Sequence, residues 1–333
     1  MRTYLGVDGG GTKTEFVLIN EAGQVLAERR EGSAYYLQIG VEALQSMLAN
    51  GIRATLAQGS ISATDLTFAF LGLPAYGEDS RFLERLNAIV SSVLPAKHYR
   101  CANDMVCGWA GALAGGDGIN IVAGTGSIAY GEFSGRVARA GGWGELFSDE
   151  GSAHWIAREG LNLFSRMSDG RIDRGPLLDI VRNHFQLRHD LDLCAAIYGP
   201  PPMPRSSVAG LAPLIAQAAR AGDQRSKGLF AAAAAELAAI VQAVADQLNV
   251  APELPLLVSY SGGLFRFSDL LLTPLQATLK EARRGYDLTE PQMSPSAGAA
   301  LYAAKLSGSP LTSGAVAALA RSFQAASDEG AGP

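Results

Sequence analysis

The stretch TYLGVDGGGTKTEFVLIN, residues 3–20, places three consecutive glycines between two segments that both alternate like β-strands. Glycine inside a strand costs backbone order and packing, so such a run is expected where the backbone turns tightly and approaches another group closely. The turn EAGQ at 21–24 and the segment VLAERR at 25–30 add a third strand. The opening therefore predicts a meander of three strands with a glycine loop between the first two.

This order of elements occurs twice. After the first meander we expect a helix over 41–58, a buried strand from Leu66, a helix over 80–93, and a short strand that ends in AND at 102–104. The stretch INIVAGTGSIAYGEFSGRVARAGG, 119–142, then repeats strand, glycine loop, strand, turn and strand. Two such units predict two similar α/β domains.

The expected division has three parts. It places an N-terminal domain over 1–115, a second domain over 116–310 with a helical insertion at about 152–249, and a C-terminal helix with a frayed tail over 311–333.

Composition excludes several classes of function. The 333 residues are 48% apolar and 18% charged, with a formal net charge of −5, and no basic stripe marks a nucleic-acid surface. The apolar stretch 229–248 is interrupted by acids and glutamines, which predicts a helix of a soluble protein without membrane contact. The chain enters its first strand at Tyr4 without the pattern of a secretion signal, so we expect a cytoplasmic protein. Three cysteines and four histidines show no zinc spacing.

Two named glycine motifs fit poorly. In a P-loop, lysine directly follows the last glycine, but here Thr12 separates Gly11 from Lys13. The segment GTGSIA, 124–129, matches the dinucleotide-binding pattern, and Glu145 is an acid near the expected position. That pattern must open a helix, whereas this segment continues as a hairpin, which disfavours an NAD-dependent oxidoreductase.

The glycine loops fit a phosphate-binding hairpin better. Bare backbone N–H groups in a tight turn can converge on an anion, and Thr12, Thr125 and Ser127 add hydroxyl donors. Asp8 precedes the first loop and would suit a bound Mg²⁺, which takes one or two carboxylates and keeps several waters. Each loop alone is equally compatible with an ordinary hairpin turn. Their equivalent positions in a repeat favour binding.

Five segments together carry a resemblance to a known family: GVDGGGTKTE, AND at 102–104, AGTGSIA, GGWGELFSDEGSAHWIA and SGGLF. From Gly6 to about Lys305 the chain resembles the sugar-kinase branch of the actin/hexokinase superfamily, and within it N-acetylglucosamine kinases and the BadF/BadG ATPase group. The resemblance implies an α/β fold of two duplicated actin-like (ribonuclease H-like) domains, each with a mixed sheet and flanking helices, and an ATP cleft between them. It also implies a homodimer.

The resemblance implies roles for the loops. ATP would be bound by glycines and threonines of the three glycine turns, the third lying against the nucleoside: Gly10, Gly11, Thr12, Gly124, Thr125, Gly126, Gly262 and Gly263. Mg²⁺ would be held by Asp8. The sugar would contact residues of four segments: Tyr35, Asp104, Ser127, Gly142, Trp143, Gly144 and Asp149. The role of Lys13, phosphate contact or plain exposure, is open, and we expect Glu150 to be structural.

Asp104 has two interpretations. It follows a short strand and precedes a helix, where aspartate often caps the helix N-terminus. Position and resemblance favour the general base that accepts the proton of the attacking sugar hydroxyl. The implied reaction is phosphorylation of the 6-hydroxyl of N-acetylglucosamine by ATP, giving N-acetylglucosamine 6-phosphate and ADP.

One departure leaves the sugar open. Many relatives carry an asparagine in the loop after the third strand, where this sequence has Tyr35 and Tyr36. Free glucosamine is therefore an alternative acceptor. An activator ATPase of the BadF/BadG type would hold an iron–sulfur cluster between subunits, but Cys101 and Cys107 lack the pairing that such a cluster needs. A sugar sensor without catalysis would not need Asp104.

Overall fold

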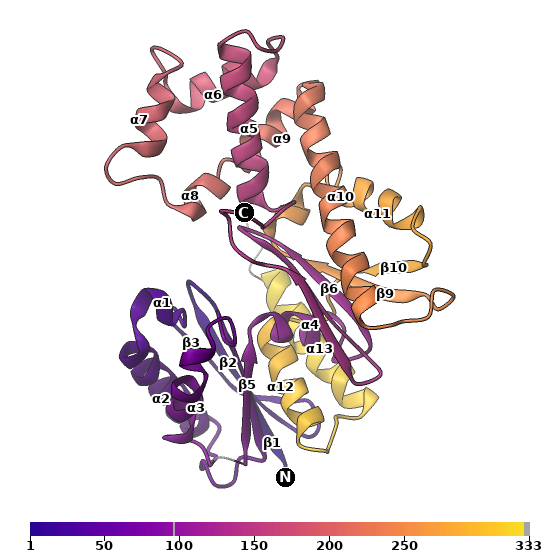
Figure 1. The fold of residues 1–333 in the computed structure, drawn as a ribbon. Coiled ribbons are helices and arrows are strands. Elements are labelled where there is room, and N and C mark those ends of the chain that lie inside the picture. Colours follow the sequence, from indigo (N-terminus) through magenta and orange to yellow (C-terminus); the bar gives the residue numbers. More distant parts are fainter. Residues whose placement is uncertain (96, 330–333) are drawn as a thin grey trace. The chain divides into compact units, whose positions relative to one another are not determined.

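The computed structural model describes residues 1–95 and 97–329, and it divides into two compact units (Figure 1). Unit 1 comprises residues 1–117 together with the chain from 290 onward, and unit 2 comprises 118–289. Each unit contains a five-stranded mixed sheet, which confirms the expected α/β fold with two similar sheets. Residues 330–333 of the expected frayed tail lie outside the described residues.

The sheet of unit 1 begins with the predicted meander. Its strand order is β3-β2-β1-β4-β5, with antiparallel pairing from β3 to β1 and parallel pairing from β1 to β5. The strands are β1 (Thr3–Gly9), β2 (Thr14–Asn20), β3 (Val25–Glu31), β4 (Phe68–Leu73) and β5 (Tyr99–Asn103). The parallel arrangement places the carboxyl ends of β1, β4 and β5 at the same end of the sheet.

Helices cover both faces of this sheet, α2 and α3 on one side and α4 and α12 on the other (Figure 1). The helices are α1 (Tyr36–Ile39), α2 (Val41–Gln58), α3 (Leu83–Ser91), α4 (Met105–Ala112), α12 (Pro295–Leu306) and α13 (Ser313–Glu329). Alternating apolar residues of the strands and one apolar face of α2 form the core between them, which includes Leu5, Phe16, Leu44 and Leu71.

Helix α12 lies in unit 1, whereas the expected division placed residues up to 310 with the second domain. It packs against β1 and α4. A Cβ on Gly298 would lie 2.0 Å from the backbone nitrogen of Gly111, so two glycines let α12 and α4 cross at backbone contact. The chain therefore returns to the first sheet after completing the second, which no local pattern indicates.

The sheet of unit 2 repeats the plan, with the strand order β10-β9-β6-β7-β8. The strands β6, β7 and β8 form the second meander, and β9 and β10 pair in parallel with it. Their bounds are β6 (Gly118–Ala123), β7 (Ser127–Phe133), β8 (Arg136–Gly141), β9 (Leu256–Ser261) and β10 (Tyr286–Thr289).

Six helices between β8 and β9 occupy the expected insertion, and a seventh follows β9. They are α5 (Ala153–Ser168), α6 (Pro176–Phe185), α7 (Asp192–Tyr198), α8 (Arg205–Ala209), α9 (Ala212–Arg220), α10 (Gln224–Gln247) and α11 (Leu272–Lys280). Helix α10 is long and apolar enough, by length and composition, to cross a membrane. It instead packs along β6, β7 and β8, with Phe230, Leu237 and Val244 fully buried, so it is a core helix of unit 2.

Candidate active site

In unit 1 the first glycine loop closes the hairpin between β1 and β2. The amide of Gly10 donates to the carbonyl oxygen of Lys13 at 2.8 Å, and the carbonyl oxygen of Gly10 accepts from the amide of Ala34 at 2.9 Å. These bonds hold the base of the loop. Gly11 and Thr12 are exposed, and a Cβ on Gly11 would meet nothing within 4 Å. The tip of this loop therefore presents bare backbone, as a phosphate-binding turn requires.

Two carboxylates of unit 1 lie at the carboxyl ends of parallel strands on either side of β4. Asp8 is near the end of β1 and aligns with Gly72 of β4, and Asp104 directly follows β5, the next strand. A Cβ on Gly72 would lie 2.3 Å from the sulfur of Cys107 and 3.0 Å from the Cα of Asp104. Gly72 thus permits the start of α4 to approach β4. The sequence signal for this close approach is the glycine inside the strand segment LGLP, 71–74.

The ionisation of Asp8 is disfavoured by its surroundings. Burial raises the pKa of Asp8 to about 7, and the negative charges of Asp104 and Glu15 act in the same direction. Lys13 and Cys107 act in the opposite direction. A divalent cation would compensate this concentration of negative charge.

The donor set is compatible with Mg²⁺. No group of three or more metal-binding side chains occurs within residues 1–95 and 97–329, so a fully protein-made cage is not present there. Mg²⁺ usually takes only one or two carboxylates and completes its shell with water and substrate phosphates. Asp8 is the residue that would hold it.

The carboxylate of Asp104 is not used as a helix cap. Within the described residues its side chain makes no capping bond to α4, and the side chain of Asn103 instead accepts from the amide of Met105 at 3.2 Å. Burial, followed by the charge of Glu78, raises the pKa of Asp104 to about 6, while the amides of Met105 and Asp104 act against this. A carboxylate with a pKa near neutrality is suited to general base catalysis.

Lys13 is exposed and pairs with a neighbouring acid. Its Nζ lies 2.6 Å from Oε1 of Glu15, which also contacts Nη2 of Arg30 at 2.8 Å. Burial alone would raise the pKa of Glu15, but the hydrogen bonds from Lys13 and Arg30 outweigh it and lower that pKa. Glu15 is therefore ionised and draws Lys13 toward β2.

The two tyrosines after β3 have different environments. Tyr36 is buried, with its ring 5.2 Å from that of Phe82, so it belongs to the core. Tyr35 is only partly buried at the turn that precedes α1. Of the pair, Tyr35 keeps a surface that could meet a sugar, and that role stays a prediction.

In unit 2 the second glycine loop, 124–126, is tied to the start of α5. The amide of Gly124 donates to the carbonyl oxygen of Gly126 at 2.9 Å. The amide of Ala153 donates to the carbonyl oxygen of Gly124 at 2.9 Å, and that of His154 to Thr125 at 3.4 Å. The first amides of α5 therefore fix the loop by its carbonyl oxygens.

Ser127, predicted to contact the sugar, is buried at the start of β7. Its hydroxyl donates to the carbonyl oxygen of Glu150 at 2.6 Å, and the side chain of Glu150 accepts from Ser148 at 3.1 Å. These bonds join β7 to the segment before α5, which agrees with a structural role for Glu150. Sugar contact by Ser127 stays a prediction.

Asp149 lies in a strained and enclosed position. Its φ angle is 59°, in the left-handed region, and its side chain is only 3% exposed. Its Oδ2 accepts a short hydrogen bond from Nη2 of Arg205, the first residue of α8, and Nε of Arg205 lies 3.2 Å from Oε2 of Glu145. No local pattern points to Arg205, because it follows the proline-rich segment 200–204 in the insertion, far from Asp149 along the chain.

The loop glycine Gly126 lies directly against this ion pair. A Cβ there would come within 2.6 Å of Nη2 of Arg205 and 2.9 Å of Oδ2 of Asp149. A side chain at position 126 would therefore have to displace the guanidinium of Arg205 or the carboxylate of Asp149 from this contact.

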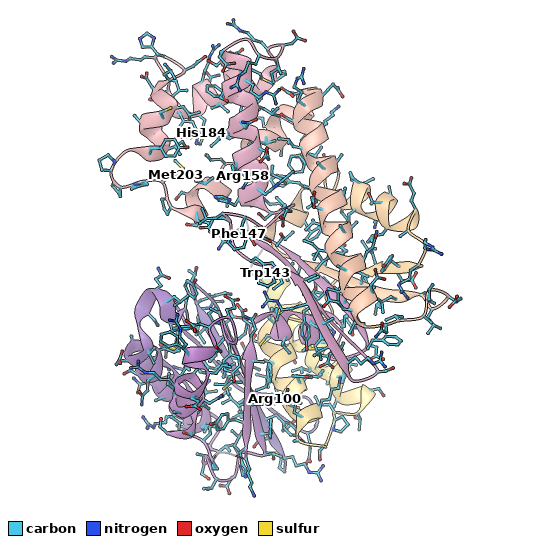
Figure 2. All side chains as sticks on the ribbon, in the orientation of Figure 1. Arg100, Trp143, Phe147, Arg158, His184 and Met203 are labelled. Atoms are coloured by element: carbon cyan, nitrogen blue, oxygen red, sulfur yellow. The ribbon has the colours of Figure 1, made fainter. Side chains whose placement is uncertain are left out.

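The GGWG segment exposes its aromatic residues. Gly142 and Gly144 have φ angles of 70° and 99°, which a side chain would strain, and Trp143 between them is 70% exposed. Figure 2 labels Trp143 and Phe147 on the segment between β8 and α5, with Arg158 farther along α5. An exposed tryptophan on a bent glycine segment is available to a ligand.

The third glycine turn follows β9. Gly262 has a φ angle of 105°, and a Cβ there would lie 2.4 Å from the carbonyl oxygen of Ala123 at the end of β6. A Cβ on Gly263 would meet nothing within 4 Å. Gly262 therefore serves packing, whereas Gly263 offers open backbone, and nucleoside contact by either stays a prediction.

Comparisons with known proteins agree with this arrangement. The BadF/BadG/BcrA/BcrD ATPase family matches residues 5–303. N-acetyl-D-glucosamine kinase of Dictyostelium discoideum is 28% identical over 90% of this chain and 97% of its own length. Glucosamine kinase GspK of Vibrio cholerae is 31% identical over 59% of this chain and 65% of its own. A Chromobacterium violaceum structure assigned as an N-acetylglucosamine kinase aligns with a TM-score of 0.66 and 26% identity, over 90% of this chain and 98% of that one.

Proposed function

This chain belongs to the BadF/BadG/BcrA/BcrD ATPase family, and on that premise we propose that it is an ATP-dependent amino-sugar kinase. The preferred acceptor is N-acetylglucosamine, phosphorylated at its 6-hydroxyl to give N-acetylglucosamine 6-phosphate and ADP. The names of the Dictyostelium and Chromobacterium relatives support this sugar. The observation that carries the proposal is Asp104, a carboxylate that makes no side-chain capping bond to α4 and has a raised pKa, with a second carboxylate, Asp8, on β1, one strand beyond β4.

The proposed reaction uses Asp104 as general base. Its carboxylate accepts the proton of the 6-hydroxyl as the oxygen attacks the γ-phosphorus of ATP. The new O6–Pγ bond forms while the bond from Pγ to the β,γ-bridging oxygen breaks, and ADP leaves with that oxygen. When bound, Mg²⁺ supplies positive charge to the phosphate oxygens, and Asp8 is the residue that would hold it.

The glycine turns have proposed roles in binding ATP. In unit 1 the exposed backbone at Gly11 and Thr12 suits the phosphates, and in unit 2 loop 124–126 suits them in the same way. The open backbone at Gly263 suits the nucleoside.

Four residues have proposed roles in sugar binding, two in each unit. Unit 2 supplies Asp149 and the exposed Trp143, and unit 1 supplies Asp104 and Tyr35. Buried or half-buried carboxylates are good acceptors for sugar hydroxyls because their hydrogen bonds are charge-assisted. We also propose that the protein is a homodimer and acts in the cytoplasm.

Free glucosamine is the second candidate acceptor, and the Vibrio relative favours it. An activator ATPase is disfavoured by the state of the thiols. Cys101 and Cys107 are both buried, and burial raises the pKa of Cys101 to about 12 and that of Cys107 as well. Cluster ligands must be accessible thiolates at the subunit surface, which these two are not.

The test is ADP release from Mg-ATP with N-acetylglucosamine, glucosamine, N-acetylmannosamine and glucose, each with wild type and Asp104→Asn. We expect ADP only with an amino sugar, and loss of that signal in Asp104→Asn although the variant keeps its circular dichroism spectrum. ADP release that needs no sugar would replace the kinase with an ATPase.

A further inference from the structure

A single arginine from the helical insertion connects three segments of unit 2. The guanidinium of Arg205 contacts Asp149 through Nη2 and Glu145 through Nε, and its Nη2 is also the atom closest to a Cβ built on Gly126. Arg205 begins α8, and α8 packs against α5. The arginine therefore joins the second glycine loop, the segment before α5, and the insertion.

Asp149 depends on this contact. A carboxylate with a 3% exposed side chain has lost most of its hydration, and a buried ion needs hydrogen bonds or an opposite charge to remain there. Among the described residues, Arg205 is the one that donates to it. The hydrogen bond from the guanidinium therefore fixes the direction of the carboxylate.

The second oxygen of this carboxylate is left for a ligand. Oδ1 has no hydrogen-bond partner within residues 1–95 and 97–329, and it is not one of the buried polar atoms that lack a partner there, so it keeps some contact with solvent. A charge-assisted acceptor whose other oxygen is already fixed loses little freedom when it binds a hydroxyl.

We propose that Arg205 is a positioning residue for sugar binding, which holds Oδ2 of Asp149 so that Oδ1 accepts hydrogen bonds from the sugar hydroxyls. This inference rests on the proposed kinase function and adds a residue of the insertion to it. Arg205 acts through Asp149 and does not itself touch the reacting atoms.

The test measures sugar and ATP kinetics for Arg205→Ala, Arg205→Lys, Asp149→Asn and the double variant Arg205→Ala/Asp149→Asn. The matched control is Arg171→Ala, because Arg171 forms an exposed ion pair with Asp169 in the same insertion. We expect the KM for the sugar to rise about 10- to 100-fold in Arg205→Ala, since a misplaced binding group costs on that order. The KM for ATP should change less than about twofold, and Arg205→Lys should recover part of the loss because it keeps the charge but not the planar fork.

The double variant separates positioning from a general structural effect. If Arg205 works only through Asp149, the double variant binds sugar no worse than Asp149→Asn alone. If the increase in sugar KM of the double variant equals the product of the two single-variant increases, the residues act independently and the inference is overturned. An unchanged sugar KM in an active Arg205→Ala would also overturn it. If Arg205→Ala does not fold, Arg205→Lys with the same cycle decides the question.

Failure of the kinase proposal is distinguishable from failure of this inference. A wild-type protein that phosphorylates no sugar overturns both. A wild-type protein that is active, with Arg205→Ala equally active at low sugar concentration, overturns only the role of Arg205.

Discussion

Replacing Asp8 with asparagine should stabilise the metal-free protein at alkaline pH while it removes activity. The pKa of Asp8 is raised from 3.8 to about 7, first by burial and then by the charges of Asp104 and Glu15. A carboxyl whose folded-state pKa lies above its unfolded value contributes stability below the unfolded pKa. That contribution is lost as the pH rises through the folded pKa.

The size of the effect follows from the shift. About three pKa units at 1.36 kcal/mol each correspond to about 4 kcal/mol, and partial contact with solvent reduces this to about 2–4 kcal/mol. From pH 4 to pH 8, wild type should lose this amount through Asp8, and Asp8→Asn should not. The stability advantage of the variant should therefore grow by about 2–4 kcal/mol over that range.

Guanidinium chloride unfolding at pH 4, 6 and 8, with and without Mg²⁺, measures the difference. Asp65→Asn is the control, since Asp65 is an exposed acid of the same unit. Mg²⁺ should stabilise wild type at pH 8 and leave Asp8→Asn unchanged, because only an ionised Asp8 would hold the metal. A difference between Asp8→Asn and wild type that is the same at pH 4 and pH 8 would refute the reasoning.

Three further predictions concern catalysis and packing. Asp104→Asn should lower kcat by about 10²–10⁴-fold. In wild type, a steady-state pH profile of kcat/KM should fall tenfold per pH unit below about 6, the pKa of Asp104. Because the charge of Glu78 raises that pKa, Glu78→Gln should move this acidic fall in kcat/KM to lower pH. Gly126→Ala should cost about 1 kcal/mol in chemical unfolding, at the low end for overpacking, because its Cβ would lie 2.6 Å from Nη2 of Arg205, the end of a side chain that can move. A loss above about 3 kcal/mol would show that the ion pair cannot yield. Burial lowers the pKa of His154, with Arg205 adding to the effect and Glu145 opposing it, so NMR titration should give a higher His154 pKa in Arg205→Ala. A lower value there would place the arginine away from the histidine.

Much of the fold was predictable because its signals are local. The glycine loops after β1 and β6 were expected from residues whose backbone must turn, and both hairpins close there. The two meanders were expected from alternating apolar residues, and the amphipathic helices from their period. Asp8 and Asp104 were predicted as a metal ligand and a base from their positions in the sequence and from the family resemblance. The parallel pairing of β1 and β5 with β4 puts these residues at the same end of the sheet, and their roles stay predictions.

What the sequence determined by itself is therefore the set of elements and the two glycine hairpins, because backbone preference and hydrophobic period are properties of neighbouring residues. Only the tertiary structure decided that α12 returns to the first sheet and that Arg205 holds Asp149. Each of these depends on which atoms meet when elements pack. That outcome is set by burial and by the pairing of charges between residues far apart in the chain, and no local pattern records it.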